Sequence, residues 1–565
     1  MEKRIIIFLI LSMALIVLYP YVMEKLGFIK RPQPARSQKE SQAPTPQPGS
    51  SSPAVAPRQP EGSAAVDKVP LPSKAAGAVT KPAAREQEVT VETDLIKVVL
   101  STRGGVVKSW ELKRYRTQDD KNPQPIQLVP TPGPGVSLVP PLELQVTDPK
   151  LQGRLAGAAY NVSRTSLILN EAQPTGDIEF SYTDPETGTH IEKRLTFANG
   201  SYLVDLGIVR SGITGPVVLS LGTNFGIHTW EEGFVGFIGP ATFIDGKLSK
   251  DTPDKEEIRT GDLKWAALQD KYFLAAAIPA DALAHQAIIR KEADKLVTVG
   301  LQTQTVLPTT AIHYRLFVGP KEYDTLKQLN LGLEDTVDFG WFIYGSWSFV
   351  RAVAKPLFYA IRFLYDITHN YGVAIILITV GVKLLLAPLA YKSYKSMKQM
   401  AAVQPEMQAL QKKHKDDRER LNKELIKLYK DKKVNPVGGC LPMFFQIPVF
   451  IALFNILYMT IELRQAPFIL WIKDLSVQDP YYILPILMGV TMFIQQKIQP
   501  TTMDPKQAQI MLLLPVFLTF LFITFPAGLV LYWLTNNVLT ILQQVITDRY
   551  LLPRAPVPVT NNVTT

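Results

Sequence analysis

Lys383 has the most unusual setting of any ionisable residue in the sequence. It lies twelve residues into an apolar run of 21 residues from Tyr371 to Tyr391, near the centre of a segment long enough to cross a bilayer. A charge at that depth costs at least about 2.5 to 3.5 kcal/mol unless water or a partner receives it. Since no Asp or Glu occurs in the apolar runs after residue 370, the sequence predicts a water-filled hollow around Lys383. The alternative is an ammonium that snorkels to the membrane interface.

Polar side chains one turn before Lys383 and in the other apolar runs support the hollow. They are hydroxyl and carboxamide groups at Thr379, Gln446, Asn455, Gln495, Gln496, Asn536 and Asn537. Each one by itself is typical of a hydrogen bond between membrane helices, which contributes about 0.6 kcal/mol on average. Together, beside an unpaired lysine, they favour a hydrated cavity.

The remaining reactive residues exclude most forms of catalysis. Cys440 is the single cysteine, so the chain has neither an internal disulfide nor a cysteine metal site. The six histidines are scattered, and no His-Glu-x-x-His pair or nucleotide-binding loop is present. We therefore expect no metal, no cofactor and no enzymatic activity.

The composition indicates which elements position these residues. The chain has 565 residues, of which 46% are hydrophobic and 19% are charged, and its mean hydropathy is +0.07. Its 44 prolines suit neither an ordinary soluble enzyme nor a chain that is disordered throughout. A membrane protein with a soluble appendage fits this composition.

The positive charge is concentrated in one segment. Residues 392–433 contain 13 basic and 6 acidic residues, whereas the whole chain has a net charge of +10. A basic segment between apolar runs is typical of a cytoplasmic loop, and we expect no direct binding of nucleic acid. We predict a helical pair here, with a first stretch that ends near Lys415 and is broken at Pro405, a charged turn at His414 to Asp417, and a second helix from Arg418 to Tyr429. It is either a solvated connector or a hairpin that receives a client.

The N-terminal residues predict an anchor and a tether. Residues 1–30 carry an apolar run after Lys3 and Arg4, which favours an uncut transmembrane signal anchor over a cleaved signal peptide, since no small-residue cleavage site follows. Residues 31–87 contain 11 prolines and few large apolar side chains, so we expect a disordered tether.

Residues 88–335 predict an all-β domain. Apolar and polar residues alternate in short runs separated by Gly, Pro and Asp, as in Asp177-Ile-Glu-Phe-Ser-Tyr and His190-Ile-Glu-Lys-Arg-Leu. This pattern favours a large antiparallel β-sandwich. The domain shows no catalytic cluster and is expected to be a scaffold.

Residues 336–370 predict an amphipathic helix in the membrane interface, because aromatic side chains surround one charged stripe. Residues 371–550 then contain five apolar spans. The last two lie in one stretch from Ile510 to Ile546, which requires a turn at Pro526-Ala527-Gly528. With the anchor, the total is six transmembrane helices. A cytoplasmic basic segment places both termini in the cytoplasm and the β domain outside.

Four segments closely resemble the YidC-type membrane protein insertases. They are residues 435–442 (Asn-Pro-Val-Gly-Gly-Cys-Leu-Pro), 462–468 (Glu-Leu-Arg-Gln-Ala-Pro-Phe), 479–486 (Asp-Pro-Tyr-Tyr-Ile-Leu-Pro-Ile) and 526–532 (Pro-Ala-Gly-Leu-Val-Leu-Tyr). The resemblance covers residues 358–550. Residues 265–279, with Gln-Asp-Lys-Tyr-Phe at 269–273, are similar to the periplasmic domain of the Gram-negative form.

The resemblance implies a fold and a site. The fold has five core helices, which enclose a hydrophilic groove open to the cytoplasm and the lipid, and a periplasmic β-supersandwich. The cation of the family's groove falls on Lys383, where Arg is usual. Lys keeps the charge but lacks the planar fork that holds a carboxylate with two hydrogen bonds. The other groove positions fall on Thr379, Gln446, Gln495, Tyr532 and Trp533.

The resemblance also implies partners and a location. The expected partners are nascent membrane proteins, the lipid bilayer, the Sec translocon and, through the cytoplasmic loops, the ribosome. The short tail, residues 551–565, contains only Arg554 as a basic residue, so it does not predict ribosome tethering. The expected location is the bacterial inner membrane, as a multi-pass protein.

We therefore predict a membrane protein insertase and folding chaperone. The basic hairpin recruits a nascent segment, the groove hydrates its polar outer tail, and its apolar helix leaves sideways into lipid. One alternative is a secondary transporter or channel, which would need titratable groups inside the spans and a two-halved repeat. Another is a membrane-anchored enzyme that acts on envelope glycans through the β domain.

Overall fold

The computed structural model describes residues 86–551 except 119–121, 134–135, 214, 231–236, 305–308, 340, 343–344, 347, 415–416, 436–437, 439–440 and 500–511. The predicted signal anchor, nearly all of the predicted tether and the C-terminal tail lie outside the described residues.

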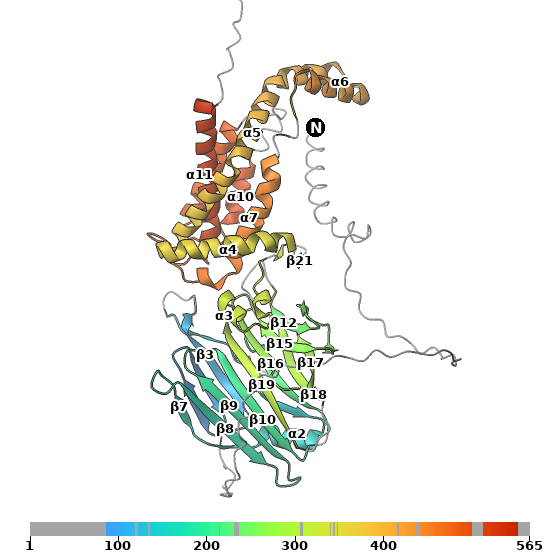
Figure 1. Cartoon of the computed structure of the whole chain (residues 1–565), viewed down its shortest axis with the longest axis vertical. Coiled ribbons are helices and arrows are strands. Elements are labelled where there is room, and N and C mark those ends of the chain that lie inside the picture. The colour runs from blue at the N-terminus through green and yellow to red at the C-terminus, as the bar shows by residue number, and fades with distance from the viewer. Residues whose placement is uncertain are drawn as a thin grey trace, which may run out of the picture. The chain divides into compact units, whose positions relative to one another are not determined.

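The described chain begins with a β domain of three larger sheets, shown in blue to yellow-green in Figure 1. The first sheet has the order β4 (Pro125–Gln127), β3 (Val106–Arg116), β2 (Ile96–Ser101), β1 (Glu88–Glu92) and β7 (Ser166–Ile168). The second has the order β13 (Lys247–Ser249), β12 (Gly239–Ile244), β15 (Leu263–Gln269), β16 (Phe273–Pro279), β19 (Thr309–Pro320), β10 (Leu203–Ser211), β9 (His190–Ala198), β8 (Thr175–Thr183) and β6 (Asn161–Val162). The third has the order β14 (Glu256–Arg259), β17 (Ala284–Ala293), β18 (Leu296–Gln304), β11 (Val217–Thr223) and β5 (Leu144–Val146).

The alternation read from the sequence corresponds to the observed burial. Along β9, every second side chain from Ile191 to Phe197 is buried, and β9 pairs with β8 and β10 in antiparallel register. β16 is different, because it lies inside the nine-stranded sheet between β15 and β19 and is buried on both faces. A strand buried on both faces has no alternation to read. The all-β prediction for residues 88–335 is confirmed in this coarse form, with two helices added among the described residues, α2 (Pro149–Gly157) and α3 (Tyr323–Gln328).

A short segment leads from the β domain to the helical region. It contains α3 (Tyr323–Gln328), the 3₁₀ turn η1 (Leu333–Thr336) and the small hairpin β20 (Trp341–Phe342) and β21 (Gly345–Ser346). The helical region follows, with α4 (Ser348–Thr368), α5 (Tyr371–Lys413), α6 (Arg418–Asp431), α7 (Leu441–Met459), the 3₁₀ turn η2 (Ile461–Leu463), α8 (Ile483–Ile498), α10 (Leu514–Phe522), α11 (Ala527–Ile546) and the π-helical turn η3 (Thr547–Leu551).

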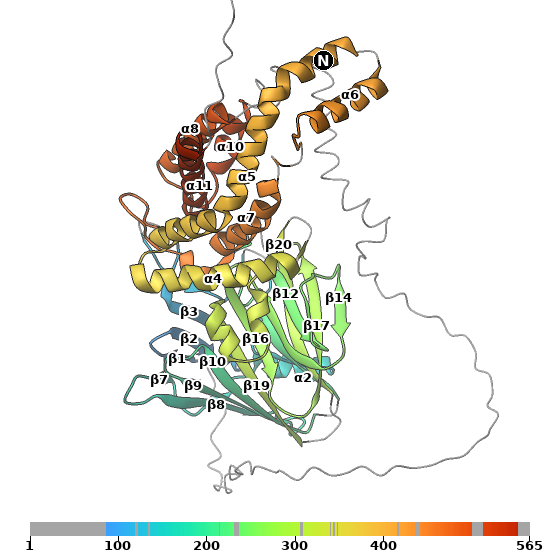
Figure 2. The same cartoon turned by 45° about the horizontal axis from the view of Figure 1, so that its top comes forward.

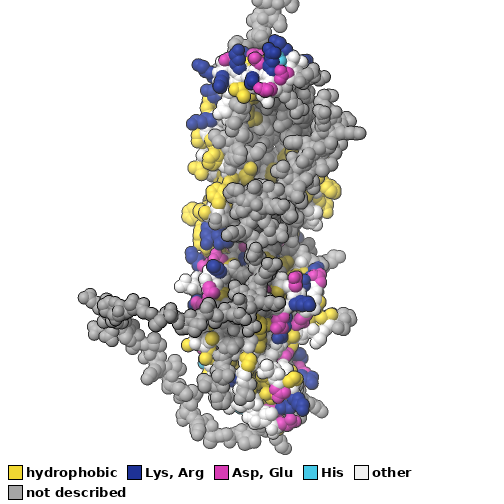
Figure 3. Space-filling view, turned by 90° about the vertical axis from the view of Figure 1, so that its right-hand side faces the viewer, with side chains coloured by type: hydrophobic (Ala, Val, Ile, Leu, Met, Phe, Trp, Pro, Cys, Tyr) yellow, Lys and Arg dark blue, Asp and Glu magenta, His cyan; other side chains and the backbone are white. Residues whose placement is uncertain are grey.

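Two of the described helices are long and apolar enough to cross a membrane, over Tyr371–Lys413 and Ala527–Tyr550, and two shorter apolar helices cover Phe445–Met459 and Ile483–Ile498. On the face drawn in Figure 3, hydrophobic side chains gather over the helices, while Lys, Arg, Asp and Glu gather at the end that α6 forms. The helical C-terminal region is confirmed. The count of six spans stays a prediction.

The predicted break at Pro405 is wrong. α5 continues without interruption from Tyr371 to Lys413, with Pro388 and Pro405 inside it, and α6 then folds back beside its end (Figure 2). Proline removes one helical hydrogen bond and frees the carbonyl four residues earlier. Pro405 is exposed, so water is available to satisfy that carbonyl. The second helix of the predicted pair is confirmed as α6.

The charged stripe of α4 faces the β domain's end. The side chain of Arg362 pairs with Asp324 on α3, and the ammonium of Lys355 lies 5.9 Å from the ring centre of Tyr323. Phe363 and Ile367 of α4 are 64% and 62% exposed. An amphipathic helix is therefore present, and its placement in a membrane interface stays a prediction.

The predicted turn at Pro526-Ala527-Gly528 is confirmed and is tied to the preceding loop. The backbone N–H groups of Ala527 and Gly528 donate to the carbonyls of Val477 and Leu475, at 2.7 and 2.9 Å. In the same loop the buried carboxylate of Asp479 accepts from the Trp471 indole at 2.9 Å and from the backbone N–H of Leu484 at 2.7 Å. These bonds close the helical region at the end opposite α6.

Side-chain contacts also join the β domain to this closed end. The Arg464 guanidinium donates to the carbonyl of Arg116 at 2.6 Å, and the Lys271 ammonium lies 4.0 Å from the ring centre of Tyr458. The amide of Asn455 on α7 donates to the carbonyl of Phe339 at 3.0 Å. Asn455 therefore holds the segment that connects the β domain to the helical region.

Candidate functional site

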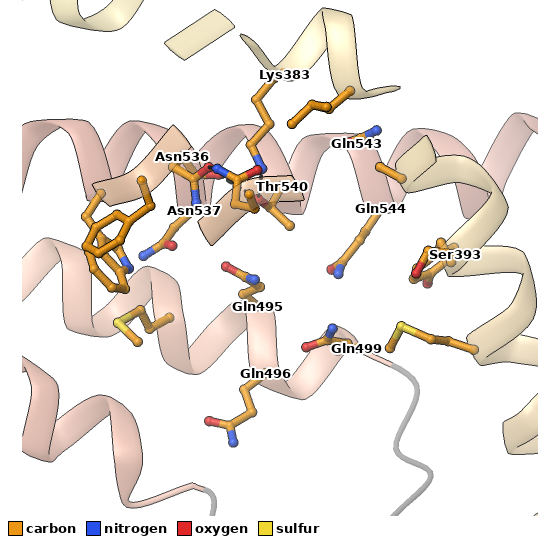
Figure 4. A pocket seen from close by; sticks show the side chains of 18 of the residues that line it. Lys383, Ser393, Gln495, Gln496, Gln499, Asn536, Asn537, Thr540, Gln543 and Gln544 are labelled. Carbon is orange, nitrogen blue, oxygen red and sulfur yellow. Dashed lines mark hydrogen bonds between the residues drawn. The ribbon is translucent and has the colours of Figure 1, made fainter. Parts of the chain in front are cut away.

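The helices α5, α7, α8, α10 and α11 surround a cavity of about 610 Å³. Its wall combines carboxamide and hydroxyl groups with aromatic and aliphatic side chains. Lys383 is the one Lys, Arg or His among the described lining residues, and they include no Asp or Glu. Figure 4 shows Lys383 extending from α5 toward α11, with amide side chains of α8 and α11 around the space below it.

The Lys383 ammonium is held by a hydroxyl. Its Nζ donates to Oγ1 of Thr540 at 2.9 Å. The Thr540 hydroxyl donates its own proton to the carbonyl of Asn536 at 2.6 Å, so its oxygen is free to accept. A lysine ammonium carries three donors, and among the described residues only this one acceptor is recorded for Lys383. Its other donors remain for water or a ligand.

Aromatic residues form the part of the wall next to α7. The ring centres of Phe450 and Trp533 are 4.9 Å apart in an edge-to-face arrangement, and Trp533 packs in the same way on Phe522 at 4.8 Å. The amide nitrogen of Gln446 lies 3.4 Å from the hydroxyl of Tyr532 and 3.5 Å from Oδ1 of Asn536. These are long contacts, so the Gln446 amide is weakly held.

The structure brings most of the sequence-predicted site residues together. Lys383, Gln446, Gln495, Tyr532 and Trp533 all line the cavity. Thr379 does not. It is 1% exposed, and its hydroxyl donates to the carbonyl of Ile375 in its own helix at 2.6 Å.

The position of Thr379 shows where the cavity ends. All cavity-lining residues of α5 lie at or after Lys383, from Lys383 through Leu386 and Ala390 to Met397. Thr379 is one turn before Lys383, on the side of the closed loops. The cavity therefore extends from Lys383 toward the end of the bundle where α6 lies.

Sequence reasoning missed several lining residues, which are Ser393, Gln499, Thr540, Gln543, Gln544 and Thr547. A signal for three of them was present. Thr540, Gln544 and Thr547 follow the predicted Asn536 at helical spacing and so continue one face of α11. They lie near the end of the helix, where a polar residue is also typical of the end of a membrane span, so the sequence alone does not assign them to a cavity.

Next to the cavity, Asp548 connects α5 to the end of α11. Its Oδ2 accepts from the Tyr394 hydroxyl at 2.5 Å, and its Oδ1 pairs with the ammonium of Lys398. We call these three residues the Asp548 bridge. Because Tyr394 also lines the cavity, the bridge fixes how far α5 stands from α11 at that end.

Comparison with known proteins gives two family matches. Residues 363–554 match the model of the 60Kd inner membrane protein, and residues 88–360 match the model of the YidC periplasmic domain.

Individual relatives agree with these matches. The chain is 38% identical over 575 residues to a protein of Geotalea daltonii named membrane protein insertase YidC, which covers 98% of this chain and 100% of that protein. It is 40% identical over 471 residues to the protein of the same name from Geobacter sulfurreducens, covering 81% and 85% of the two chains. A solved structure of an active YidC insertase matches 84% of this chain and 94% of its own, at 19% identity and a TM-score of 0.34.

Proposed function

The chain belongs to the YidC family of membrane protein insertases, and from this premise we propose how its own residues perform insertion. The cavity receives the polar outer tail of a nascent membrane protein, and the apolar segment of that client then moves into lipid. The names of the relatives give no support to a transporter or channel.

The observation that carries this proposal is an unpaired cation in a mixed polar and apolar cavity. Lys383 has one hydroxyl acceptor and, among the described lining residues, no carboxylate to pair with. In a medium less polar than bulk water, such a charge attracts an anion more strongly than it would at a protein surface. An acidic residue in a client tail is the complementary group.

Release of the client helix from the cavity into lipid requires an apolar path. It requires no chemical energy source. Exposed aromatic side chains, Phe493 of α8 and Phe517 and Phe520 of α10, stand on helices that also border the cavity. A client helix of ~20 apolar residues gains free energy on entering lipid. We propose that this partitioning, together with the membrane potential, drives insertion, and that no bond is made or broken.

The remaining parts of the proposal concern topology and partners. The α5 and α6 hairpin lies in the cytoplasm and recruits clients. α4 lies in the interface on the outer side of the inner membrane, and both termini are cytoplasmic. The first 30 residues form a sixth span, and residues 31–87 form the tether. The Sec translocon and the ribosome, through the cytoplasmic loops, are the proposed partners beyond the client and the bilayer.

The test compares substitutions at Lys383 in proteoliposomes, with protease protection of the client tail as the readout. For a client with an acidic outer tail, Lys383→Arg should insert at nearly the original rate, because the charge survives. Lys383→Ala should insert about ten-fold more slowly, which corresponds to about 1.4 kcal/mol. Lys383→Glu should be slower still, because it repels the tail.

The controls separate the cavity from the general positive charge. A neutral-tailed client should be affected much less by all three substitutions. Lys395→Ala removes an exposed lysine of the same helix that is outside the cavity lining, and it should leave the rate unchanged. If Lys383→Glu inserts the acidic-tailed client at the original rate in a folded protein, the electrostatic part of the proposal fails.

A further inference from the structure

Several glutamine side chains in the cavity wall have no hydrogen-bond partner among the described residues. Gln495 of α8, Gln499 directly after α8, and Gln543 and Gln544 of α11 line the cavity, and no hydrogen bond from their side chains to a described residue is present. Gln544 is only 7% exposed, and its Oε1 is buried without a partner. A buried carboxamide oxygen left unbonded costs about 1 to 3 kcal/mol. Such a group is expected to meet a ligand or water during the protein's work.

Carboxamides that join two elements in this protein have hydrogen-bond partners, unlike these glutamines. Asn537 of α11 turns its amide toward α8, where it lies 3.5 Å from the carbonyl of Met488 and 3.4 Å from the hydroxyl of Thr491. Asn455 of α7 likewise donates to a backbone carbonyl. The cavity glutamines have no such partner, so packing between helices does not explain them.

The amides form two facing rows. Figure 4 shows Gln495 from α8, Gln499 at the residue after α8, and Gln544 from α11 directed into the same space. Gln495 and Gln499 are four residues apart, which is roughly 6 Å along a helix. On α11 the amides of Asn536 and Gln544 are eight residues apart, which is roughly 12 Å or two such steps, and the hydroxyl of Thr540, which binds Lys383, lies between them.

This repeat matches that of an extended polypeptide. An extended chain rises about 3.3 Å per residue, so the peptide groups that point to one edge recur at about 6.6 Å. A carboxamide carries one acceptor oxygen and two donor hydrogens, and so it can bond either the N–H or the C=O of a peptide group. This bonding does not depend on which side chains the bound polypeptide carries.

We propose that the cavity binds the client's outer tail as an extended chain, with the glutamines of α8 and α11 bonding its backbone peptide groups. This inference rests on the proposed function of the cavity and names what is recognised there. Lys383 supplies the preference for acidic tails, whereas the amides supply an affinity that does not depend on tail sequence. Tails without any charge are therefore bound as well.

The test pairs a change in the protein with a change in the client backbone. Two synthetic single-span clients carry neutral outer tails of equal length, one of glycine and one of sarcosine, which is N-methylglycine and has no backbone N–H. The full-length protein in proteoliposomes carries Gln495→Met, Gln499→Met and Gln544→Met, alone and combined. Methionine keeps the side-chain length and removes the amide.

The combined variant should insert the glycine tail about ten-fold more slowly than the unsubstituted protein and the sarcosine tail less than two-fold more slowly. This difference between the two ratios measures the coupling between the amides and the peptide N–H. Equal slowing of both tails would mean that the amides only hydrate the cavity, and it would overturn the inference, as would no slowing of either tail.

Further variants keep the outcome interpretable. Gln544→Asn keeps an amide and should retain most of the glycine-tail rate, whereas Gln544→Met removes the amide and should not. Equal slowing by the two variants would indicate a change in packing or stability and not the loss of the amide. Gln478→Met makes the same chemical change at an exposed residue outside the cavity lining and should change neither rate. If the combined variant is unfolded, the single variants decide by the same comparison of the two tails.

Failure of this inference is distinguishable from failure of the proposed function. If Lys383→Ala still slows acidic-tailed clients while the glycine and sarcosine tails respond equally to the glutamine variants, only the recognition of the backbone is wrong. If neither Lys383 nor the glutamines affect any client, the cavity is not the client site.

Discussion

At the scale of single residues, Lys193 shows how the β domain tolerates a charge in its core. It is fully buried, and its Nζ donates to the carbonyls of Gly104, Gly105 and Leu142 at 2.9, 3.0 and 2.8 Å. All three of these residues have positive φ angles, of 70°, 58° and 67°. The left-handed backbone turns three carbonyls toward one point, where they match the three donors of an ammonium.

We expect Lys193→Met to destabilise the β domain by on the order of 3 kcal/mol, because it leaves three buried carbonyls unpaired. The free energy of unfolding of the full-length protein, followed by a signal from the β domain, measures this. The exposed Lys247→Met in β13 is the matched control and should change the stability by less than about 0.5 kcal/mol.

The same residue predicts a dependence on pH. Burial lowers the pKa of Lys193 to about 7, while the charge of Glu143 acts in the opposite direction. Between pH 7 and 9 the unfolded chain therefore holds a proton at this position that the folded chain has released, so the free energy of unfolding should rise with pH, by at most about 1.4 kcal/mol per pH unit. In Lys193→Met this rise should be smaller. An identical pH profile in both proteins would contradict the assignment.

Lys193 and Thr379 show what the sequence reveals about single residues. The alternation in β9 already places Lys193 on the same face as Ile191 and Leu195, so a buried lysine could be predicted. The local pattern also places Thr379 on the face of Lys383, but it does not reveal where the cavity closes. The loops at that end are tied by a bond between residues distant in sequence, in which the backbone N–H of Ala527 donates to the carbonyl of Val477.

At the scale of elements, the Asp548 bridge links α5 to the turn that follows α11, and we expect it to restrict the spacing of the two helices. We expect Asp548→Asn to lower the stability by only about 1 kcal/mol, because Lys398 and Asp548 are 40% and 32% exposed and their attraction is screened by solvent. Its larger effect should be on geometry. In a Cys440→Ser background, spin labels at Lys395→Cys and Arg549→Cys should show a broader distance distribution when Asp548 is replaced. An unchanged distribution would mean that other contacts fix the helices.

The hairpin of α5 and α6 should be required for insertion but contribute little to stability. Its apolar contacts form a small separate cluster of Met400, Val403 and Val434, with Met407, Leu428 and Tyr429 against it. Deleting residues 400–430 removes most of this cluster and leaves the Asp548 bridge in place. The deletion variant should remain folded in the membrane and lose client insertion.

A variant that changes only the charge of the hairpin tests whether its positive charge, and not just its presence, recruits clients. Lys423, Lys427 and Lys430, replaced together by Gln, keep the helix and remove three positive charges from α6. If recruitment is electrostatic, client binding should weaken and become less sensitive to salt. Normal insertion by the deletion variant would show that the hairpin does not recruit clients.

Element boundaries were predicted where a local signal decides them. The turn at Pro526 and the start of α6 follow from such signals, and Asp417 caps α6 by accepting from the backbone N–H of Arg420 at 2.9 Å. The length of α5 was not predictable in this way. Proline at position 405 signals a break locally, but Met400 and Val403 before it and Met407 after it share one apolar cluster with Leu428, Tyr429 and Val434, which holds the helix together on both sides of the proline.

At the scale of the whole molecule, the cavity is built by the helical region alone. Every described lining residue belongs to α5, α7, α8, α10 or α11, or directly adjoins the end of α8 or α11. Deleting residues 88–321 while keeping α3, η1 and α4 should therefore leave insertion within about two-fold of the full-length rate in proteoliposomes. Loss of all activity in a folded truncated protein would show a direct role for the β domain.

The retained segment matters for this design. Phe358 of α4 packs between the rings of Tyr323 and Phe339, with centroid distances of 5.6 and 4.9 Å, and Asn455 bonds the carbonyl of Phe339. A deletion that extends to Phe339 should destabilise α4 and α7 together. Comparing the two deletions separates loss of the β domain from damage to the helices it adjoins.

The uninterrupted course of α5 also has a mechanical consequence. Lys383 and the last residue of the helix, Lys413, are 30 residues apart, which is roughly 45 Å along one helix. A continuous helix of this length is a lever arm, so we expect a force on a nascent chain recruited by the hairpin to reach the cavity as a torque about the apolar half of α5, residues 371–391. Two glycines inserted after Met400 would place a joint in the rod, and single-molecule pulling on a tethered client should then record a smaller force transmitted to its transmembrane segment.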